Sequence, residues 1–383
     1  MREVYLDNSA TTRVSEEAAK AVYEVMTSYY GNPSSLHKKG IEAERLLTDA
    51  RETIAKGLGV TPGEIYFTSG GTESNNIAIK GTAYALRRFG KHIITTKVEH
   101  PSVLETCKQL EREGYTVTYL EVGSDGTVNL EALERALTPD TILVSIMYVN
   151  NEVGAIEPIE QTSKLIKNNK NTIFHVDAVQ AFGKIKLVPK VQGIDLLSAS
   201  SHKIYGPKGV GCLFVRQKVK ITPIINGGGQ ENGLRSGTEN LPGIVGFGVA
   251  ARQALENLDS WHEKMAALKR ELKEGILTQI PDTVVNGPEE GAPHILNISF
   301  LGCRGEIILH ALEAKGIYVS TGSACSSRKT QQSHVLRAMH KNDQEIEGAV
   351  RFSLSPFLEM DDIHYTIEVL KNEIKEIRKF TRR

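Results

Sequence analysis

The feature that most constrains the fold is a series of short apolar segments that alternate with helical patterns between residues 64 and 225. The expected strands are EIYFTS, HIITT, VTYLEV, TILVSIMYV, TIFHVD, DLLSAS, GVGCLFV and ITPII, with helices among them at 129–137 and 159–170. Several of these segments are apolar on both faces, as strands of a mostly parallel, helix-covered sheet are. The pattern predicts an α/β architecture that binds its ligand at the carboxyl ends of the strands.

The composition changes after this region. Residues 226–243, NGGGQENGLRSGTENLPG, form a glycine-rich loop too long for a simple connection. A long helix is expected next, with apolar residues at three- and four-residue spacing: Leu255, Leu258, Trp261, Met265, Leu268, Leu272 and Ile276. Strands HILNISF, IYVST and VRFSLS and a last helix near 361–380 indicate a smaller α+β unit. We therefore expect a large domain at 14–257, a small domain at 258–383 and an N-terminal arm at 1–13.

Charge and cysteine spacing exclude several classes of function. The formal net charge is +0 and no long basic run occurs, which argues against nucleic acid or an anionic membrane as partner. No apolar stretch approaches a membrane span, and MREVYLDNSATT lacks the apolar core of a signal peptide. Cys107, Cys212, Cys303 and Cys325 have no metal-ligand spacing, so we expect thiols in a reducing compartment. The sequence thus predicts a cytoplasmic protein without a resident metal site.

Polar residues follow two of the expected strands in a way that suits an anionic, ring-containing ligand. YFTSGGTESNN places Gly70, Gly71 and Thr72 between a strand and a helix, where free backbone N–H groups can bind phosphate. FHVDAVQ places Asp177 at a strand end, with Gln180 one helical turn later. The ordinary alternatives are a plain strand-to-helix turn for the glycines and a helix N-cap for the aspartate.

Two further strand ends carry titratable groups. TKVEHPSV places His100 just before Pro101, at an expected helix start, and SSHKIYGPKGVG places Ser200, His202 and Lys203 at the end of an apolar strand. A histidine in a loop or a surface lysine in a turn would be the ordinary interpretation of either one alone. A phosphate cradle, an acid, an imidazole and a lysine together match the needs of pyridoxal 5′-phosphate. The lysine would bind the cofactor as a Schiff base, and the aspartate would keep its pyridine nitrogen protonated.

At these residues the sequence resembles the group I cysteine desulfurases (NifS/IscS type) of the class V aminotransferase-like enzymes. GGTESNN, VNNEVG, HVDAVQ, SSHKIYGPKGVG, GLRSGTEN and STGSACSS occur in the family's order, and the similarity covers nearly the whole chain. The resemblance implies a fold type I (aspartate aminotransferase-like) enzyme, with a mostly parallel central sheet and a smaller α+β C-terminal domain. It also implies a homodimer.

The resemblance assigns a role to each of the polar residues. Lys203 would hold the cofactor, Asp177 would pair with its ring nitrogen, and His100 would stack on the ring. Gln180 would face the phenolic oxygen. The implied phosphate ligands are Gly71, Thr72, Ser200 and His202, together with Thr238 from the other subunit. Asn151 and Arg351 would hold the substrate carboxylate, which a guanidinium can bind through two parallel hydrogen bonds.

Cys325 decides the implied reaction. It lies in STGSACSS, among small polar residues that suit an exposed loop, whereas the other three cysteines are expected to be buried. The resemblance makes Cys325 the nucleophile that takes sulfur from L-cysteine as a persulfide, with Lys203 moving the α-proton and L-alanine released. His100 would act as acid or base near the substrate thiol. Cys325 could also serve as a transient iron–sulfur ligand.

Other functions are compatible with some of the same residues. A selenocysteine lyase or an aminotransferase could share this scaffold, although an aminotransferase would not need Cys325. A sulfur carrier or scaffold without cofactor would leave Lys203, Asp177 and the phosphate cradle unexplained. The expected partner is a sulfur acceptor or cluster scaffold protein. The sequence does not distinguish iron–sulfur cluster assembly, tRNA thiolation and nitrogenase maturation as destinations of the sulfur.

Overall fold

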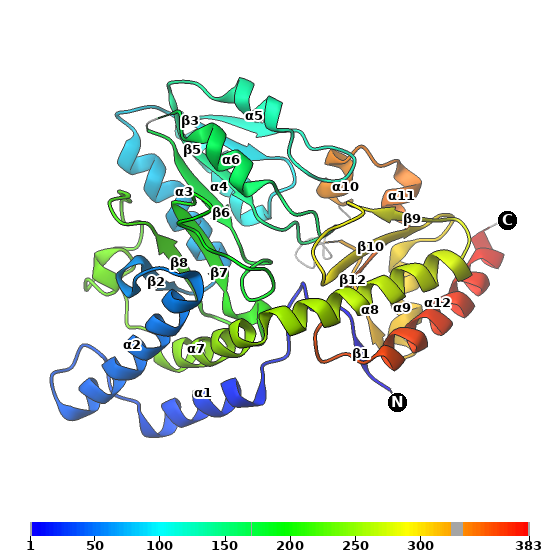
Figure 1. The fold of residues 1–383 in the computed structure, drawn as a ribbon, viewed down its shortest axis with the longest axis horizontal. Helices are drawn as coiled ribbons and strands as arrows, with labels where there is room; N and C mark the ends of the chain where they lie inside the picture. Colours follow the sequence, from blue (N-terminus) through cyan, green and yellow to red (C-terminus); the bar gives the residue numbers. More distant parts are fainter. Residues whose placement is uncertain (1, 170, 323–331, 382–383) are drawn as a thin grey trace.

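The central feature of the fold is a seven-stranded sheet in the first two-thirds of the chain (Figure 1). The computed structural model describes residues 2–169, 171–322 and 332–381. From edge to edge the strands are β2 (Ile65–Thr68), β8 (Gly211–Val215), β7 (Leu196–Ser200), β6 (Ile173–Asp177), β5 (Thr141–Met147), β3 (His92–Thr96) and β4 (Thr116–Leu120). Neighbouring strands from β7 to β4 are parallel, and only β8 runs antiparallel to both of its neighbours.

This sheet confirms seven of the eight strands expected from the apolar segments. ITPII, at 221–225, is wrong as a strand: only an isolated bridge joins Ile225 to Arg235. Pro223 lies in this segment and has no N–H to donate to a ladder, and the N–H of Thr222 bonds to the carbonyl of Gly81 instead. The apolar residues of the segment pack beside the sheet without joining it.

Helices cover the sheet. α3 (Gly71–Leu86) contacts β5, β6, β7 and β8, and α4 (Pro101–Arg112) packs against α3. α5 (Leu130–Ala136) begins after its N-cap Asn129, as expected, whereas α6 (Ile159–Ile166) ends four residues before the expected 170. Two helices that the apolar pattern does not predict, α1 (Glu16–Ser28) and α2 (Lys38–Leu58), both pack on α7 (Leu241–Glu256). Short 3₁₀ turns occur at Pro62–Glu64, Ser201–Lys203 and Glu231–Gly233.

The expected long helix is divided in two. Asn257, with φ −104° and ψ 12°, separates α7 from α8 (Leu258–Gln279), so Leu255 belongs to the first helix and the other expected apolar positions to the second. Met265, Leu268, Leu272 and Ile276 form the buried face of α8, as their spacing predicted. In Figure 1, α8 runs from the large sheet toward the C-terminal strands.

The C-terminal part is a smaller sheet covered by helices. β12 (Ala349–Ser353), β10 (Ile295–Phe300) and β9 (Thr283–Asn286) form an antiparallel sheet in that order, against which α8 packs. The remaining helices are α9 (Gly305–Glu313), α10 (His334–Ala338), α11 (Asp343–Glu347) and α12 (Met360–Thr381). The expected IYVST strand is short: β11 (Ile317–Tyr318) pairs in parallel with β1 (Val4–Tyr5) of the N-terminal arm.

Two large hydrophobic clusters correspond to the two sheets. One lies around the seven-stranded sheet and includes Phe174, Phe214 and Phe247, and the other includes Phe300 and Phe352. Val4 and Leu6 of the arm belong to the second cluster, so the arm is packed into the C-terminal part. The domain limits 14–257 and 258–383 stay a prediction. Within the described ranges, none of the helices has the length and apolarity that a bilayer span requires.

Candidate active site

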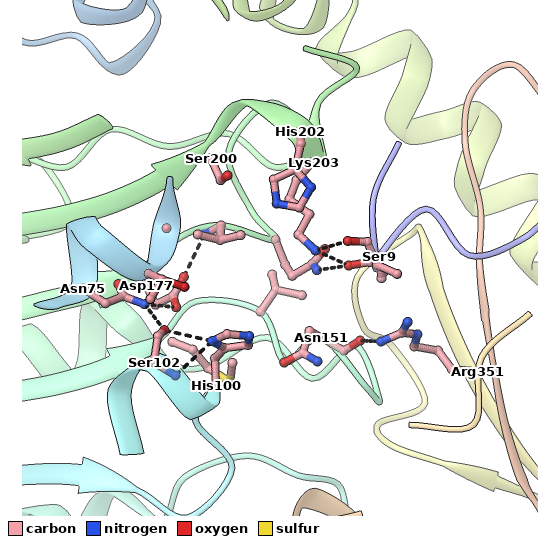
Figure 2. Close-up of a pocket in the computed structure, with 17 residues that line it drawn as sticks. Ser9, Asn75, His100, Ser102, Asn151, Asp177, Ser200, His202, Lys203 and Arg351 are labelled. Atoms are coloured by element: carbon pink, nitrogen blue, oxygen red, sulfur yellow. Dashed lines mark hydrogen bonds between the residues drawn. The ribbon is translucent and has the colours of Figure 1, made fainter. Parts of the chain in front are cut away.

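A cleft opens at the carboxyl ends of the central strands, next to the N-terminal arm and β12 (Figure 2). It brings together residues that lie as much as 342 positions apart in the sequence. The lining residues are Ser9, Ala10, Gly71, Thr72, Asn75, His100, Ser102, Met147, Val149, Asn151, Asp177, Val179, Gln180, Ser200, His202, Lys203 and Arg351. All predicted site residues except Thr238 and Cys325 are in this set.

The start of α3 forms one side of the cleft. Gly70 has φ 147°, a backbone region that side chains rarely adopt, and no side chain caps the helix. A Cβ on Gly71 would lie 2.6 Å from Val179 Cγ2, so only glycine allows the helix to begin this close to the turn after Asp177. The first N–H groups of α3 therefore stay available to an anion, beside Thr72, Ser200 and His202 in an adjoining pocket.

Asp177 ends β6 and is held by two donors. Val179 N donates to Oδ1 at 3.0 Å, and Asn75 Nδ2 donates to Oδ2 at 2.7 Å. Asn75 Nδ2 also donates to Ser102 Oγ at 2.9 Å, which links the aspartate to the neighbouring helix α4. The carboxylate is fixed and buried while it lines the cleft, as a partner for a protonated ring nitrogen must be.

His100 is the N-cap of α4, a position that fixes its tautomer. Ser102 N donates to His100 Nδ1 at 3.1 Å, and Ser102 Oγ lies 2.8 Å from the same nitrogen. Burial lowers the pKa of His100. The negative charge of Asp177 acts in the opposite direction, and repulsion from Lys203 lowers the pKa further. Because a backbone N–H can only donate, the neutral imidazole carries its proton on Nε2. His100 therefore offers the cleft a hydrogen-bond donor.

Lys203 ends the 3₁₀ turn after β7 and reaches the N-terminal arm. Its Nζ donates to the carbonyl oxygens of Ser9 at 2.5 Å and Ala10 at 2.7 Å (Figure 2). Gln180 Nε2 donates to the same Ser9 oxygen at 3.0 Å. The arm therefore covers the lysine and aligns it with Gln180. Sequence reasoning missed Ser9 because a backbone carbonyl leaves no signature in its residue type.

The arm also holds the histidine beside this lysine. His202 Nδ1 lies 3.1 Å from Thr11 Oγ1, and Thr12 Oγ1 donates to the backbone oxygen of His202. Burial, with repulsion from Lys203 and Lys208, lowers the pKa of His202 to about 3. His202 is therefore neutral at pH 7 and can contribute one N–H to an anion without adding charge.

Arg351 of β12 lies opposite, almost fully buried. Its Nη1 donates to the backbone oxygen of Asn151 at 3.0 Å and its Nη2 to Asp7 Oδ1 at 2.8 Å. Its Nε is buried without a hydrogen-bond partner. The guanidinium thus belongs to a residue that lines the cleft beside the backbone of the predicted substrate ligand Asn151, and its Nε–H is still without a partner.

The other predicted residues lie elsewhere. Thr238 is exposed and does not line the cleft of its own chain, and Cys325 lies outside the described residues. The remaining cysteines are buried free thiols, as expected. Burial raises the pKa of Cys107 and Cys212 to about 12 and also raises that of Cys303. None of these three is a thiolate at pH 7.

Two buried polar atoms test whether pyridoxal phosphate fits here. Ser200 Oγ, beside the start of α3, has no hydrogen-bond partner, and neither has Arg351 Nε. An unsatisfied buried polar atom costs about 1–3 kcal/mol, so two of them on residues that line one cleft are compatible with a polar ligand there. A phosphate at Ser200 and a carboxylate at Arg351 would satisfy both. The open end of α3, Asp177 and Lys203 supply the other contacts that this cofactor needs.

Comparison with known proteins agrees with this geometry. The aminotransferase class-V family model matches residues 4–365. A curated cysteine desulfurase IscS of Dictyoglomus turgidum is 47% identical over 378 residues, which cover 98% of this chain and 96% of the relative. A cysteine desulfurase of Nostoc sp. is 47% identical over 379 residues, 99% of this chain and 94% of the relative. The chain belongs to the cysteine desulfurases of the class V aminotransferase family.

Solved structures agree in fold as well. A NifS-like protein superposes with a TM-score of 0.93 at 41% identity, covering 98% of this chain and all of the other. A structure described as SspA in complex with cysteine has a TM-score of 0.83 at 35% identity, over 93% of this chain. The fold type I architecture and the family resemblance are thus confirmed, and the cofactor of this family is pyridoxal 5′-phosphate.

Proposed function

We propose that the chain converts L-cysteine to L-alanine with pyridoxal 5′-phosphate bound through Lys203, and carries the sulfur as a persulfide on Cys325. One observation carries the proposal: the cleft of a cysteine desulfurase family member combines Lys203, Asp177 and the unpartnered Ser200 hydroxyl at neighbouring strand ends. The cofactor, when bound, supplies an electron sink for the α-carbon of the substrate. The protein supplies orientation and proton transfer.

The residues around the cleft divide this work. Arg351 and Asn151 are placed to bind the substrate carboxylate at the β12 side, and the Nε of Arg351 is the free donor there. The amine of Lys203, once released by the substrate, is the group to move the α-proton. Neutral His100 carries its proton on Nε2, so in this tautomer it can donate a hydrogen bond to the substrate sulfur. Accepting a proton would require the other tautomer.

Cys325 is proposed as the sulfur carrier by elimination as well as by family motif. A persulfide forms when a thiolate attacks the substrate sulfur, and Cys107, Cys212 and Cys303 are buried with raised pKa values. The S–S bond forms as the carbon–sulfur bond breaks, and the carbon product takes up a proton to become alanine. A selenocysteine substrate would use the same steps.

A homodimer is part of the proposal. Several large apolar side chains of α1 and the following loop are exposed, with exposed fractions of 71% for Tyr23, 63% for Met26, 71% for Tyr30 and 96% for Leu36. Such a patch is typical of an interface. Thr238 is exposed too, and the ion pair of Arg235 with Glu73 holds its loop at the first turn of α3. This placement suits a contact with the phosphate of a second subunit.

The recipient of the sulfur is proposed as an acceptor protein of iron–sulfur cluster assembly or tRNA thiolation. Relatives named cysteine desulfurase IscS support the first of these. Location in the cytoplasm stays a prediction from the cysteine spacing.

The test is a single-turnover assay on the purified holoenzyme with L-cysteine. Alanine should form, and peptide mass spectrometry should find the added sulfur on the peptide that contains Cys325. Cys325→Ala should keep the cofactor's visible absorption but transfer no sulfur, whereas Cys303→Ala should behave like the wild type. Lys203→Ala should lose both the absorption and the turnover. Added sulfur on Cys107, Cys212 or Cys303, or an unchanged spectrum in Lys203→Ala, would refute these assignments.

A further inference from the structure

A buried lysine lies behind the cleft. Lys184 lies four residues after Gln180, in the turns between β6 and β7, and is 3% exposed. Over the described ranges, no carboxylate forms an ion pair with Lys184. Burying an unpaired ammonium is costly, so its place in the fold calls for a role that offsets the cost. The sequence pattern gave no reason to single it out.

The hydrogen bonds of Lys184 converge on one atom of the site. Its Nζ donates to Gln180 Oε1 at 3.3 Å, and His294 Nε2 lies 3.4 Å from the same oxygen. An ammonium has donors but no acceptor, so it can face Gln180 only through the carbonyl end of the amide. Gln180 Nε2 is thereby turned to the opposite side, where it donates to Ser9 O at 3.0 Å. Its second N–H remains for the cleft that Gln180 lines.

The groups around Lys184 are basic, so this part of the protein favours an anionic ligand in the cleft. Burial lowers the pKa of Lys184 to about 7, and repulsion from Lys203 and Arg351 adds to this. The neighbouring elements contribute His294, and His262 of α8 lies 3.3 Å from the Lys184 backbone oxygen. All of these groups are basic. Anions in the cleft would offset the repulsion and favour the charged form of Lys184.

We propose that Lys184 is a positioning residue: it fixes the amide of Gln180 so that an N–H, and not the carbonyl, faces the phenolic oxygen of pyridoxal phosphate. The inference rests on the proposed function, which places Gln180 at that oxygen. Without the lysine, both ends of the amide can face the cleft, and the wrong end would place a carbonyl dipole against an anionic oxygen. His294, neutral because burial keeps its pKa well below the ordinary value, assists from the same side.

The test compares Lys184→Met with Lys186→Met, which removes an exposed lysine two residues away. The first readout is the pKa with which the visible absorption of the holoenzyme changes, and the second is the dissociation constant for pyridoxal phosphate. A donor and a positive charge near the phenolic oxygen both favour the deprotonated form of the bound cofactor. Lys184→Met should therefore raise the pKa of that band by about 1 and weaken cofactor binding roughly tenfold. Lys186→Met should change neither.

A double-mutant cycle shows whether Lys184 acts through Gln180. Gln180→Ala should reproduce most of the spectral change, and adding Lys184→Met to it should shift the band pKa much less than the same substitution does in the wild type. Additive effects would overturn the proposal. Should Lys184→Met fail to fold, Gln180→Glu gives the same answer, because it keeps an acceptor for Lys184 but removes the N–H. An unchanged band pKa in Gln180→Glu would overturn the positioning role.

Different results would contradict the role of Lys184 and the proposed desulfurase function. If Gln180→Ala leaves the band unchanged while Lys203→Ala abolishes it, Lys184 does not position a cofactor ligand, but the proposed function stands. If the wild-type chain shows no visible band with pyridoxal phosphate, the proposed function fails, and the role of Lys184 fails with it.

Discussion

The unsatisfied hydroxyl of Ser200 should have opposite effects on the stability of the cofactor-free protein and on its affinity for the cofactor. In the cofactor-free chain Ser200 Oγ is buried without a partner, so its removal should not destabilise the fold. We expect Ser200→Ala to raise the free energy of unfolding of the cofactor-free protein by up to about 1 kcal/mol and to weaken pyridoxal phosphate binding several-fold. Urea unfolding and a cofactor titration measure the two effects.

Ser201 provides the matched control for this prediction. Its hydroxyl is also buried without a partner, but it does not line the cleft. Ser201→Ala should thus leave the cofactor dissociation constant unchanged. Equal weakening of binding in both variants would mean that Ser200 does not contact the phosphate.

At the residue scale, sequence reasoning finds groups whose type and place along the chain carry the signal. Asp177, His100 and Lys203 each follow an apolar strand, and the structure brings all three to one cleft. Asn75 and Ser102 were missed because an amide and a hydroxyl on helices have many ordinary uses. Their link between Asp177 and His100 exists only once α3 and α4 pack together.

At the scale of elements, His100 has two duties that substitution can separate. It caps α4 through Nδ1, and its ring lines the cleft. Asparagine is a favourable N-cap, so His100→Asn should keep the free energy of unfolding within about 0.5 kcal/mol of the wild type, whereas His100→Ala should lose about 1 kcal/mol. Both should lose most desulfurase activity because neither has an imidazole. Thermal or urea unfolding, with alanine production, checks both parts.

Two results with the His100 variants would contradict this division of roles. If His100→Asn keeps near-native turnover, the ring has no part in proton transfer and His100 is a structural cap alone. If the asparagine variant is as unstable as the alanine variant, the hydrogen bond from Ser102 N is not what stabilises the start of α4.

Elements defined by local periodicity were predicted well, and those defined by distant contacts were not. The buried strands β3, β5 and β7 were evident from their apolar residues alone. By contrast, β1 is only Val4–Tyr5 and becomes a strand by pairing with Ile317–Tyr318, more than 300 residues away. ITPII has the composition of a strand, but the backbone of Thr222 bonds outside the sheet. Periodicity carries no information about such competition.

At the scale of the whole molecule, buried titratable groups set the response to acid. Burial lowers the pKa of His175 to about 3 and that of His294 well below 6.5, and His202 also falls to about 3. In the other direction, burial raises the pKa of Glu157 to about 8 and that of Glu99 well above 4.5. In acid below pH 6.5 the unfolded chain binds protons on these histidines, whereas the folded chain keeps the histidines neutral and holds extra protons only on the two glutamates. The unfolded chain therefore binds more protons in total as the pH falls toward 4.5.

Stability should thus fall as the pH is lowered through this range. A net difference of one proton changes the free energy of unfolding by about 1.4 kcal/mol per pH. Urea unfolding of the cofactor-free protein at pH 6.5 and 5.0 measures the slope. His175→Gln should reduce it, and His310→Gln should not, because His310 is exposed. A stability that stays constant or rises toward pH 5.0 would show that the glutamates dominate.

The proposed dimer predicts that each active site needs residues from both subunits. If Thr238 of one subunit completes the phosphate site of the other, each site takes Lys203 from one chain and Thr238 from its partner. Lys203→Ala and Thr238→Val chains should each be impaired alone. Mixed and allowed to exchange, they form heterodimers in which one site has both residues and the other has neither. Random exchange of equal amounts should restore about a quarter of the wild-type activity at limiting cofactor.

The same mixture distinguishes the opposite arrangement. If Thr238 serves its own chain, every site in the heterodimer lacks either the lysine or the threonine, and mixing restores nothing. A control mixture of Lys203→Ala with Asp177→Asn gives that result by design, because both residues line the cleft of one chain. Recovery in the first mixture and none in the second would place Thr238 at the partner's phosphate, in keeping with its exposed position outside the lining of its own cleft.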